Sequence, residues 1–310
     1  MKSFKTYHIC LSAGDEVYCR CEEDYFRCFN SLALAVAETD SRLLADSLMS
    51  THVHECVRTR TPEWLVTRQR YSYSRYFNNR YGRKGRLGER QPCIVELDGL
   101  HHILTAISYV LRNPLHHGVT STPFGYPYSS VCEYFRKDLH GTALAGAVSD
   151  SRAYKYLPYK VRLPDGYHMD GNGMILRDTV IDVADVEHMF VTPRSFLYYM
   201  NRLSGEEWVR EQEKDKNGRL PVTIDVVERG VGFQSLTQML SNEHGRSDYN
   251  AMSDIRLCTF IDNDIVRKYG KNSVYALSEK EKSEIGNMLW RTYRIPEAQI
   301  RRCLAMEYRP

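Results

Sequence analysis

Two histidines, His52 and His54, stand two residues apart with Val53 between them. In an extended strand, residues with this spacing point to the same face and lie about 6.5 to 7 Å apart along the chain. Both imidazoles could then reach one metal ion. The same spacing also fits two histidines on a polar strand face, so the pair alone does not decide between these readings.

A tyrosine and an amide follow on a predicted helix over residues 100–113. Tyr109 and Asn113 are four residues apart, so they share one face of that helix. A tyrosine hydroxyl could supply a nucleophile, and an amide oxygen could supply a third metal ligand. Alternatively, Tyr109 is one of 22 tyrosines that pack helices, and Asn113 only ends the helix before Pro114.

A basic block extends from Arg58 to Arg90, with ten Arg or Lys residues against only Glu63 and Glu89. Aromatic residues alternate with these charges, a combination that supplies both phosphate contacts and stacking surfaces for single-stranded nucleic acid. A solvated helix whose tyrosines pack inward would show the same pattern. The candidate DNA contacts in this block are Arg75, Tyr76, Arg80, Arg83, Lys84, Arg86 and Arg90.

The elements that must position these residues follow from hydrophobic periodicity and from capping residues. Strands are expected at 5–11, 16–21, 42–49, 53–57 and 93–97, and helices at 24–38, 62–81 and 100–113. This order predicts an α+β fold with a central antiparallel sheet and helices on one side of it.

Three regions are expected: 1–135 as the domain that carries the chemistry, 136–250 as a mixed middle region of unknown role, and 251–310 as a helical element. The polar run 205–216 in the middle region is expected to be a solvated face.

In the last region we expect a helix over 253–269, and a second helix that Ser278 and Glu281 cap. A short turn then leads to a basic helix, as in a helix-turn-helix. Its candidate DNA contacts are Gln299, Arg301 and Arg302.

Composition limits the class of protein. The hydrophobic fraction of 42% is ordinary for a globular chain, and no apolar run reaches the eighteen or so residues of a membrane span. The first residues lack a signal-peptide pattern, and the nine cysteines include no CxxC pair. We therefore expect a cytoplasmic protein with reduced thiols and no membrane partner.

Three stretches together resemble one known family, the single-tyrosine HUH transposases and in particular the REP-associated tyrosine transposases. Residues 49–55 (MSTHVHE) resemble the family's histidine strand, 75–90 its basic segment, and 108–119 (SYVLRNPLHHGV) its tyrosine helix. The sequence PYSS at 127–130 follows as in the family, and the likeness covers about residues 5–135.

The resemblance implies a ferredoxin-like HUH domain and a metal-dependent transposase, an endonuclease and strand transferase acting on single-stranded or hairpin DNA. It implies His52 and His54 as catalytic metal ligands, Asn113 as a third ligand and Tyr109 as the nucleophile that forms a 5′-phosphotyrosine. The ligand types favour Mg²⁺ or Mn²⁺. Some family members work as homodimers.

The sequence departs from the family in two places. Ser50 and Thr51 stand where the family usually has Pro-Asn, and residues 87–90 lack the usual aromatic character. Both departures concern the choice of DNA more than the chemistry. Three alternatives stay open: a DNA-binding regulator that keeps the fold without cleaving, a relaxase or replication initiator, and a metallohydrolase that uses the two histidines.

Overall fold

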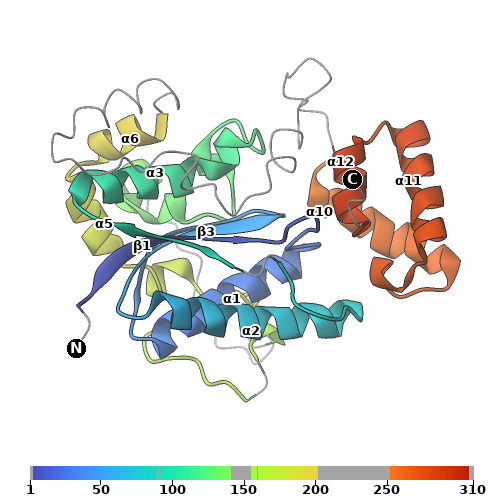
Figure 1. Ribbon diagram of the computed structural model, residues 1–310. Helices are drawn as coiled ribbons and strands as arrows, with labels where there is room; N and C mark the ends of the chain where they lie inside the picture. The colour runs from blue at the N-terminus through green and yellow to red at the C-terminus, as the bar shows by residue number, and fades with distance from the viewer. Residues whose placement is uncertain (1–2, 89–90, 141–154, 159, 202–251, 307–310) are drawn as a thin grey trace.

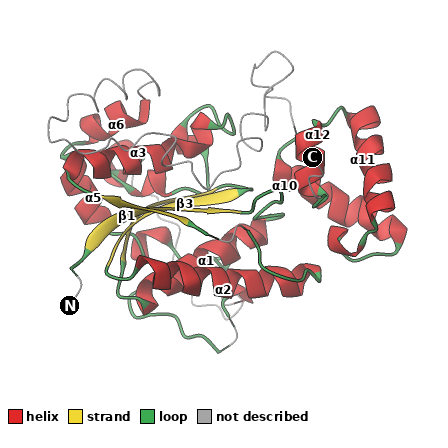
Figure 2. Ribbon diagram, in the orientation of Figure 1, coloured by secondary structure: helices red, strands yellow, loops and turns green. Residues whose placement is uncertain are grey.

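The computed structural model describes residues 3–88, 91–140, 155–158, 160–201 and 252–306. At its centre lies an antiparallel four-stranded sheet with the strand order β2-β3-β1-β4 (Figure 2). Its strands are β1 (Lys5–Ser12), β2 (Arg42–Leu48), β3 (His52–Thr59) and β4 (Cys93–Leu97). The α+β prediction is confirmed, and only the extended piece at 16–21 forms no strand.

Helices cover both faces of the sheet, so the expectation of helices on one side is wrong. Helices α1 (Glu22–Glu38) and α2 (Pro62–Tyr81) lie on one face, and α3 (Leu100–His116) and α6 (Pro193–Asn201) lie on the other (Figure 1). The burial of β3 explains this arrangement, because seven of its eight residues are buried whichever way they point. A sheet buried on both faces needs a layer of helices on each.

The two helices on the first face end where their sequences predict. Pro62 begins α2 without losing a hydrogen bond, because the first amide groups of a helix have no intrahelical partner. Gly82, with a φ of 64°, ends it in the left-handed conformation that glycine adopts without strain. From α1, Phe29 and Leu32 reach the core, which Tyr73 and Phe77 of α2 share.

Helix α3 is one turn longer than expected. It passes through Pro114 and ends at His116, and the amide of His117 still donates to the carbonyl of Asn113 over 3.0 Å. Pro114 removes only one amide donor in the last turn. The extra turn adds His117 to the helix face that already carries Tyr109 and Asn113.

The described part of the middle region belongs to the same core as the sheet. Ile175, Ile181 and Phe196 are buried with the side chains of β2 and α3. A buried ion pair adds a polar link, because Nε of Arg177 donates to Oδ2 of Asp46 on β2 over 3.2 Å. The helices here are α4 (Arg136–Leu139), α5 (Val183–Phe190) and α6, with a 3₁₀ turn at Arg177–Thr179. Two further 3₁₀ turns, at Pro123–Gly125 and Ser130–Glu133, connect α3 to this region. The run 205–216 lies outside the described residues.

The last region forms a helical unit, as the sequence predicts, and its buried apolar residues form a cluster together with Val17. Helix α10 (Asp254–Phe260) continues through a π-helical turn (Ile261–Ile265) and a 3₁₀ turn (Val266–Tyr269), and Gly270 ends it. A 3₁₀ turn at Val274–Ala276 precedes α11 (Glu279–Tyr293) and α12 (Glu297–Cys303). Ser278 and Glu281 form the expected capping box. Among the described helices, none has the length and apolar character to cross a membrane.

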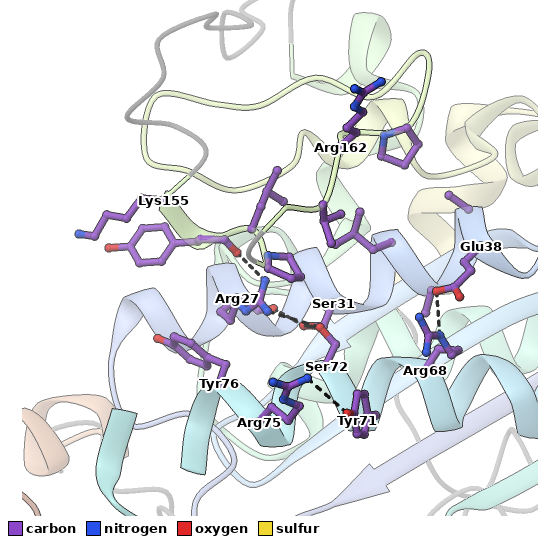
Figure 3. A pocket seen from close by; sticks show the side chains of 18 of the residues that line it. Arg27, Ser31, Glu38, Arg68, Tyr71, Ser72, Arg75, Tyr76, Lys155 and Arg162 are labelled. Atoms are coloured by element: carbon purple, nitrogen blue, oxygen red, sulfur yellow. Dashed lines mark hydrogen bonds and ion pairs between the residues drawn. The ribbon is translucent and has the colours of Figure 1, made fainter. Parts of the chain in front are cut away.

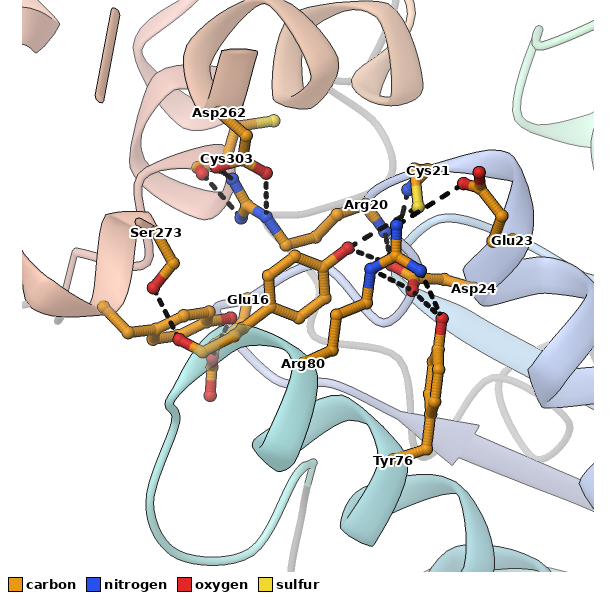
Figure 4. A network of polar contacts seen from close by, with 12 residues as sticks. Glu16, Arg20, Cys21, Glu23, Asp24, Tyr76, Arg80, Asp262, Ser273 and Cys303 are labelled. Atoms are coloured by element: carbon orange, nitrogen blue, oxygen red, sulfur yellow. Dashed lines mark hydrogen bonds and ion pairs between the residues drawn. The ribbon is translucent and has the colours of Figure 1, made fainter. Parts of the chain in front are cut away.

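Arg20 fastens this helical unit to the sheet domain (Figure 4). Its guanidinium is fully buried and donates to both carboxylate oxygens of Asp262, over 2.8 and 2.9 Å. Its third donor bonds the carbonyl of Cys303 over 2.9 Å. The hydroxyl of Tyr275, in the helical unit, donates a hydrogen bond of 2.9 Å to Glu16 of the sheet domain. An ion pair and hydrogen bonds therefore connect the helical unit to the sheet domain.

A second buried link runs through Asp254. Its carboxylate accepts two bonds of 2.8 Å from Arg302 and one of 2.7 Å from the hydroxyl of Ser50, directly before β3. Burial raises the pKa of Asp254, but the charge of Arg302 and these hydrogen bonds lower it more, so its pKa lies below the ordinary value of 3.8. The carboxylate is therefore charged at neutral pH.

We expect Asp254→Asn to lower the free energy of unfolding by about 3 to 5 kcal/mol, because it leaves the Arg302 guanidinium buried without its counter-charge. Urea denaturation at pH 7 measures this loss. The control is Glu297→Gln, which breaks an exposed pair with Arg301 and should cost less than about 1 kcal/mol.

The difference between wild type and Asp254→Asn should also depend on pH. Because the folded pKa of Asp254 is lowered, its contribution is present above pH 3.8 and is lost as the pH falls through the folded value. Equal losses from the two substitutions at pH 7 would contradict this account of the link.

Candidate active site

The pairing of β1 with β3 brings the first side chains of the site together. His52 lies opposite Ser12, and His54 lies opposite Cys10. Strand alternation sends both imidazoles to the α3 face of the sheet, whereas Val53 points to the other face. Both histidines are fully buried. Their ring centroids lie 4.9 Å apart, so the two imidazoles share one small site, as their spacing predicts.

Helix α3 supplies the remaining predicted side chains. Oδ1 of Asn113 accepts a hydrogen bond of 3.1 Å from Nε2 of His52. The Nδ2 group of the same amide donates to the hydroxyl of Tyr109 over 3.3 Å and to Nε2 of His117 over 3.2 Å. Asn113 thus contacts the histidine strand and the tyrosine at once. The structure therefore brings all four predicted residues into one cluster.

Three further residues belong to this cluster. His8 on β1 stacks against His54 with ring centroids 5.1 Å apart, and its Nε2 lies 3.0 Å from Nδ1 of His54. Oγ1 of Thr51 lies 2.9 Å from Nδ1 of His52. His117 packs edge-on against His52 at 5.4 Å.

Sequence reasoning did not find these roles. The candidate site residues predicted from the sequence include neither His8 nor His117. A signal for His117 exists, because it stands eight residues after Tyr109 and so lies on the same helix face. No local signal marks His8, whose position opposite the histidine strand depends on which strands pair.

Three histidines of the cluster, His8, His54 and His117, are held in their neutral forms. Burial lowers the pKa of His8 to about 3. Burial, followed by the neighbouring histidines, lowers the pKa of His54 well below its ordinary value of 6.5, and that of His117 likewise. A neutral imidazole keeps a lone pair on one nitrogen, which is the form that binds metal ions.

Two observations fit a divalent cation at this cluster. Nε2 of His54 is buried and has no hydrogen-bond partner among the described residues. Nε2 of His52 and Oδ1 of Asn113 are 3.1 Å apart, and neighbouring ligands of an octahedral ion with bonds of about 2.1 Å are separated by about 3 Å. No three His, Cys, Asp or Glu side chains of the described part of the chain could hold a metal, and the Asn113 amide beside His52 is the candidate for a third protein ligand.

Tyr109 lies at the edge of this cluster. Its ring packs edge-on against His54, with centroids 5.3 Å apart, and only 6% of the residue is exposed. A substrate would have to reach a hydroxyl that the protein largely covers in this conformation.

A basic groove of about 1070 Å³ lies on the other side of the sheet, between α1, α2 and residues 155–158 and 161–164 (Figure 3). Among the described residues, its charged lining consists of Arg27, Arg68, Arg75, Arg80, Lys155 and Arg162, with Glu38 as the single acid. Tyr71, Tyr76 and Tyr156 supply aromatic surface. Of the predicted DNA contacts, Arg75, Tyr76 and Arg80 line this groove, and they lie on the face opposite Tyr109.

The other basic residues predicted to contact DNA, in the block from Arg58 to Arg90, differ in their exposure to solvent. Lys84 and Arg86 are exposed, whereas Arg83 is half-buried in an ion pair with Glu16. Arg90 lies outside the described residues.

The loop after α2 leads toward the end of β1 that carries the histidine site. Gly88 has a φ of 80°, and a Cβ there would lie 2.2 Å from the carbonyl oxygen of Ser12, whose partner on β3 is His52. Only glycine permits this approach. The contact fixes the end of the basic loop beside the first residue of the histidine strand.

The three candidates on α12 are placed differently from what we expected. Gln299 and Arg302 are 1% and 3% exposed, and both donate to Asp254. Both side chains point inward to hydrogen bond the Asp254 carboxylate of α10. They are therefore too buried to contact DNA in this conformation. Arg301 is partly exposed and pairs with Glu297.

Comparisons with known proteins add little. No protein-family model matches the sequence, and no curated protein matches it either. Among solved structures, a REP-associated tyrosine transposase bound to a REP hairpin matches 47% of this chain and 88% of its own, with 13% identity and a TM-score of 0.38. Similarity at this level does not establish a family, so the function has to be argued from the site itself.

Proposed function

We propose that the protein is a metal-dependent DNA strand transferase that cuts single-stranded or hairpin DNA through Tyr109. The observation that carries the proposal is the double contact of Asn113, whose amide bonds both His52 of the histidine strand and the Tyr109 hydroxyl. A nucleophile and a metal-binding group held by the same side chain are what a phosphoryl transfer of this kind requires.

The reaction is a transesterification. The Tyr109 oxygen forms a bond to the scissile phosphorus, the bond from phosphorus to the 3′ oxygen breaks, and the phenol proton passes overall to that leaving oxygen. The product is a 5′-phosphotyrosine and a free 3′ hydroxyl, and a strand end that attacks the phosphotyrosine restores the tyrosine. The number of phosphoester bonds is unchanged, so no nucleotide cofactor is needed.

His52, His54 and Asn113 would hold the cation, with Mg²⁺ or Mn²⁺ suited to their nitrogen and oxygen donors. When bound, the ion neutralises the charge that develops on the non-bridging phosphate oxygens. The protein's own part is to fix three donors and one hydroxyl on rigid elements. A phenol with an ordinary pKa of about 10 is a weak nucleophile, so its placement beside a cationic site matters.

The basic groove is our candidate for holding the nucleic acid. The exposed Tyr71 ring and the half-buried Tyr76 ring offer stacking surfaces, and Arg75 lies 5.4 Å from the Tyr71 ring centroid. A strand gripped there would have to pass around the sheet edge to reach Tyr109. The basic loop that ends at Gly88 runs in that direction and carries Lys84 and Arg86.

The topology agrees with this proposal. The order β-α-β-β-α-β, with β1 and β3 at the centre, supports the ferredoxin-like domain that we propose. A helix-turn-helix role for α11 and α12, a homodimer and a cytoplasmic location remain predictions from the sequence.

A second candidate function is a DNA-binding regulator that does not cleave. The burial of Tyr109 favours it, because a covered hydroxyl cannot attack a phosphate without a movement of the protein. The two functions share the fold and the basic groove, and they differ only in whether a covalent adduct forms.

Tyr109→Phe should abolish a covalent protein-DNA adduct and leave the fold intact, because the substitution removes only one hydroxyl. The measurement incubates both proteins with labelled hairpin-bearing single-stranded DNA and Mn²⁺, followed by a denaturing gel. Tyr198→Phe on the exposed face of α6 is the matched control and should form the adduct. If wild type forms none with DNA that it binds, the regulator is the correct function.

Asn113→Ala should weaken Mn²⁺ binding by at least about tenfold, because it removes the one oxygen ligand that the proposed set of protein ligands contains. Isothermal titration calorimetry measures the affinity. Asn79→Ala, which removes an exposed amide on α2, serves as the control and should bind as wild type does. Unchanged affinity in Asn113→Ala would remove this residue from the ligand set.

The double variant Arg75→Ala/Arg162→Ala should bind single-stranded DNA more weakly and with less dependence on salt. Each lost phosphate contact lowers the slope of log affinity against log salt by about 0.7 for a single strand. Fluorescence anisotropy over a salt series gives this slope. The control Arg42→Ala removes an exposed arginine that pairs with Asp182 outside the groove. If the double variant keeps the wild-type slope, the groove is not the DNA site.

A further inference from the structure

His8 is fully buried in the site, and neither the sequence pattern nor the proposed reaction gives it a role. It stands on β1 two residues before Cys10, which is the partner of His54 in the β1–β3 register. Its ring lies on the same face of the sheet as the two predicted metal ligands. The rings of His8 and His54 are stacked with an angle of 30° between their planes, so the two side chains pack against each other.

The bond between these two rings restricts where protons can be. Nε2 of His8 and Nδ1 of His54 are 3.0 Å apart, and two neutral imidazoles can place only one proton between them. If His8 donates, the proton of His54 is on Nε2, and that nitrogen has no lone pair for a metal. If His54 donates from Nδ1, its Nε2 keeps the lone pair.

The surroundings of His54 favour the second arrangement once a cation is present. Nε2 of His54 is buried without a hydrogen-bond partner among the described residues, and a cation would satisfy its lone pair. Only the arrangement in which His8 accepts makes that lone pair available. Metal-binding histidines usually donate from their other nitrogen to such an acceptor, which fixes the ring and its tautomer.

Thr51 is the hydrogen-bond partner of His52 at Nδ1, as His8 is of His54. Its hydroxyl lies 2.9 Å from Nδ1 of His52, and a hydroxyl can donate or accept. Without metal, His52 donates from Nε2 to Asn113, so its Nδ1 accepts from Thr51. With metal, the Thr51 hydroxyl can rotate and accept instead. Each histidine of the strand therefore has one partner at Nδ1.

We propose that His8 is a positioning residue that accepts the Nδ1 proton of His54 and so directs the Nε2 lone pair of His54 toward the cation. The inference rests on the proposed metal function and adds a fifth residue to its site. His8 does not touch the substrate or the ion. It acts through the tautomer of His54.

The test compares His8→Phe with His8→Gln. Phenylalanine keeps a ring for stacking but offers no acceptor, whereas the glutamine side chain can bring its amide oxygen close to the position of Nε2. We expect His8→Phe to lower the affinity for Mn²⁺ by about 10- to 100-fold in calorimetry, and His8→Gln to recover most of it. Thermal melts of both variants check that they fold.

A second measurement reads the tautomer itself. In ¹⁵N NMR spectra of the Mg²⁺-loaded full chain, His54 of wild type should carry its proton on Nδ1, and His8→Phe should lose this preference. The same affinity and the same His54 tautomer in folded His8→Phe would overturn the inference while leaving the metal function in place. If wild type binds neither Mn²⁺ nor Mg²⁺, the metal function and the inference both fail.

Discussion

The antiparallel pairing of β1 with β3 is the interaction on which the rest of the structure depends. It forms the centre of the sheet, and its register decides which side chains meet on each face. On one face it collects His8, His52 and His54 beneath α3, and on the other it buries apolar residues against α1 and α2. A shift of one residue would exchange these two sets. The same hydrogen bonds thus determine both the core and the candidate active site.

A polar cluster buried this deeply is stable only when its members satisfy one another. Asn113 does most of this, because its amide accepts from His52 and donates to Tyr109 and His117. Among the described residues of this cluster, Nδ1 of His8 and Nε2 of His54 lack a hydrogen-bond partner, and Nε2 of His54 is the atom that the proposed cation would satisfy. The loop before β3 connects this cluster to the helical unit through the bond between Ser50 and Asp254. Ser50 therefore has a structural role in this chain, because its hydroxyl connects the start of the histidine strand to the helical unit.

Sequence reasoning succeeded where periodicity within one element carries the information. The spacing of His52 and His54 matches a strand, and that of Tyr109 and Asn113 matches a helix. The sequence therefore predicted that each pair lies on one face of its element. It failed where contacts between distant segments decide. His8 enters the site only because β1 pairs with β3, and Gln299 and Arg302 turn inward only because Asp254, more than forty residues earlier, is buried beside them. Likewise, the placement of α3 and α6 on the second face of the sheet could not be predicted from local patterns.

The most direct test of a metal-binding site that shares Asn113 with the nucleophile is a crystal structure of the full chain grown with Mn²⁺, with anomalous data collected at the manganese edge. The account predicts one strong anomalous peak about 2.1 to 2.3 Å from Nε2 of His52, Nε2 of His54 and Oδ1 of Asn113, with the Tyr109 hydroxyl beside it. The account would be contradicted if crystals with saturating Mn²⁺ showed no anomalous peak at this cluster and kept the hydrogen bond between His52 and Asn113.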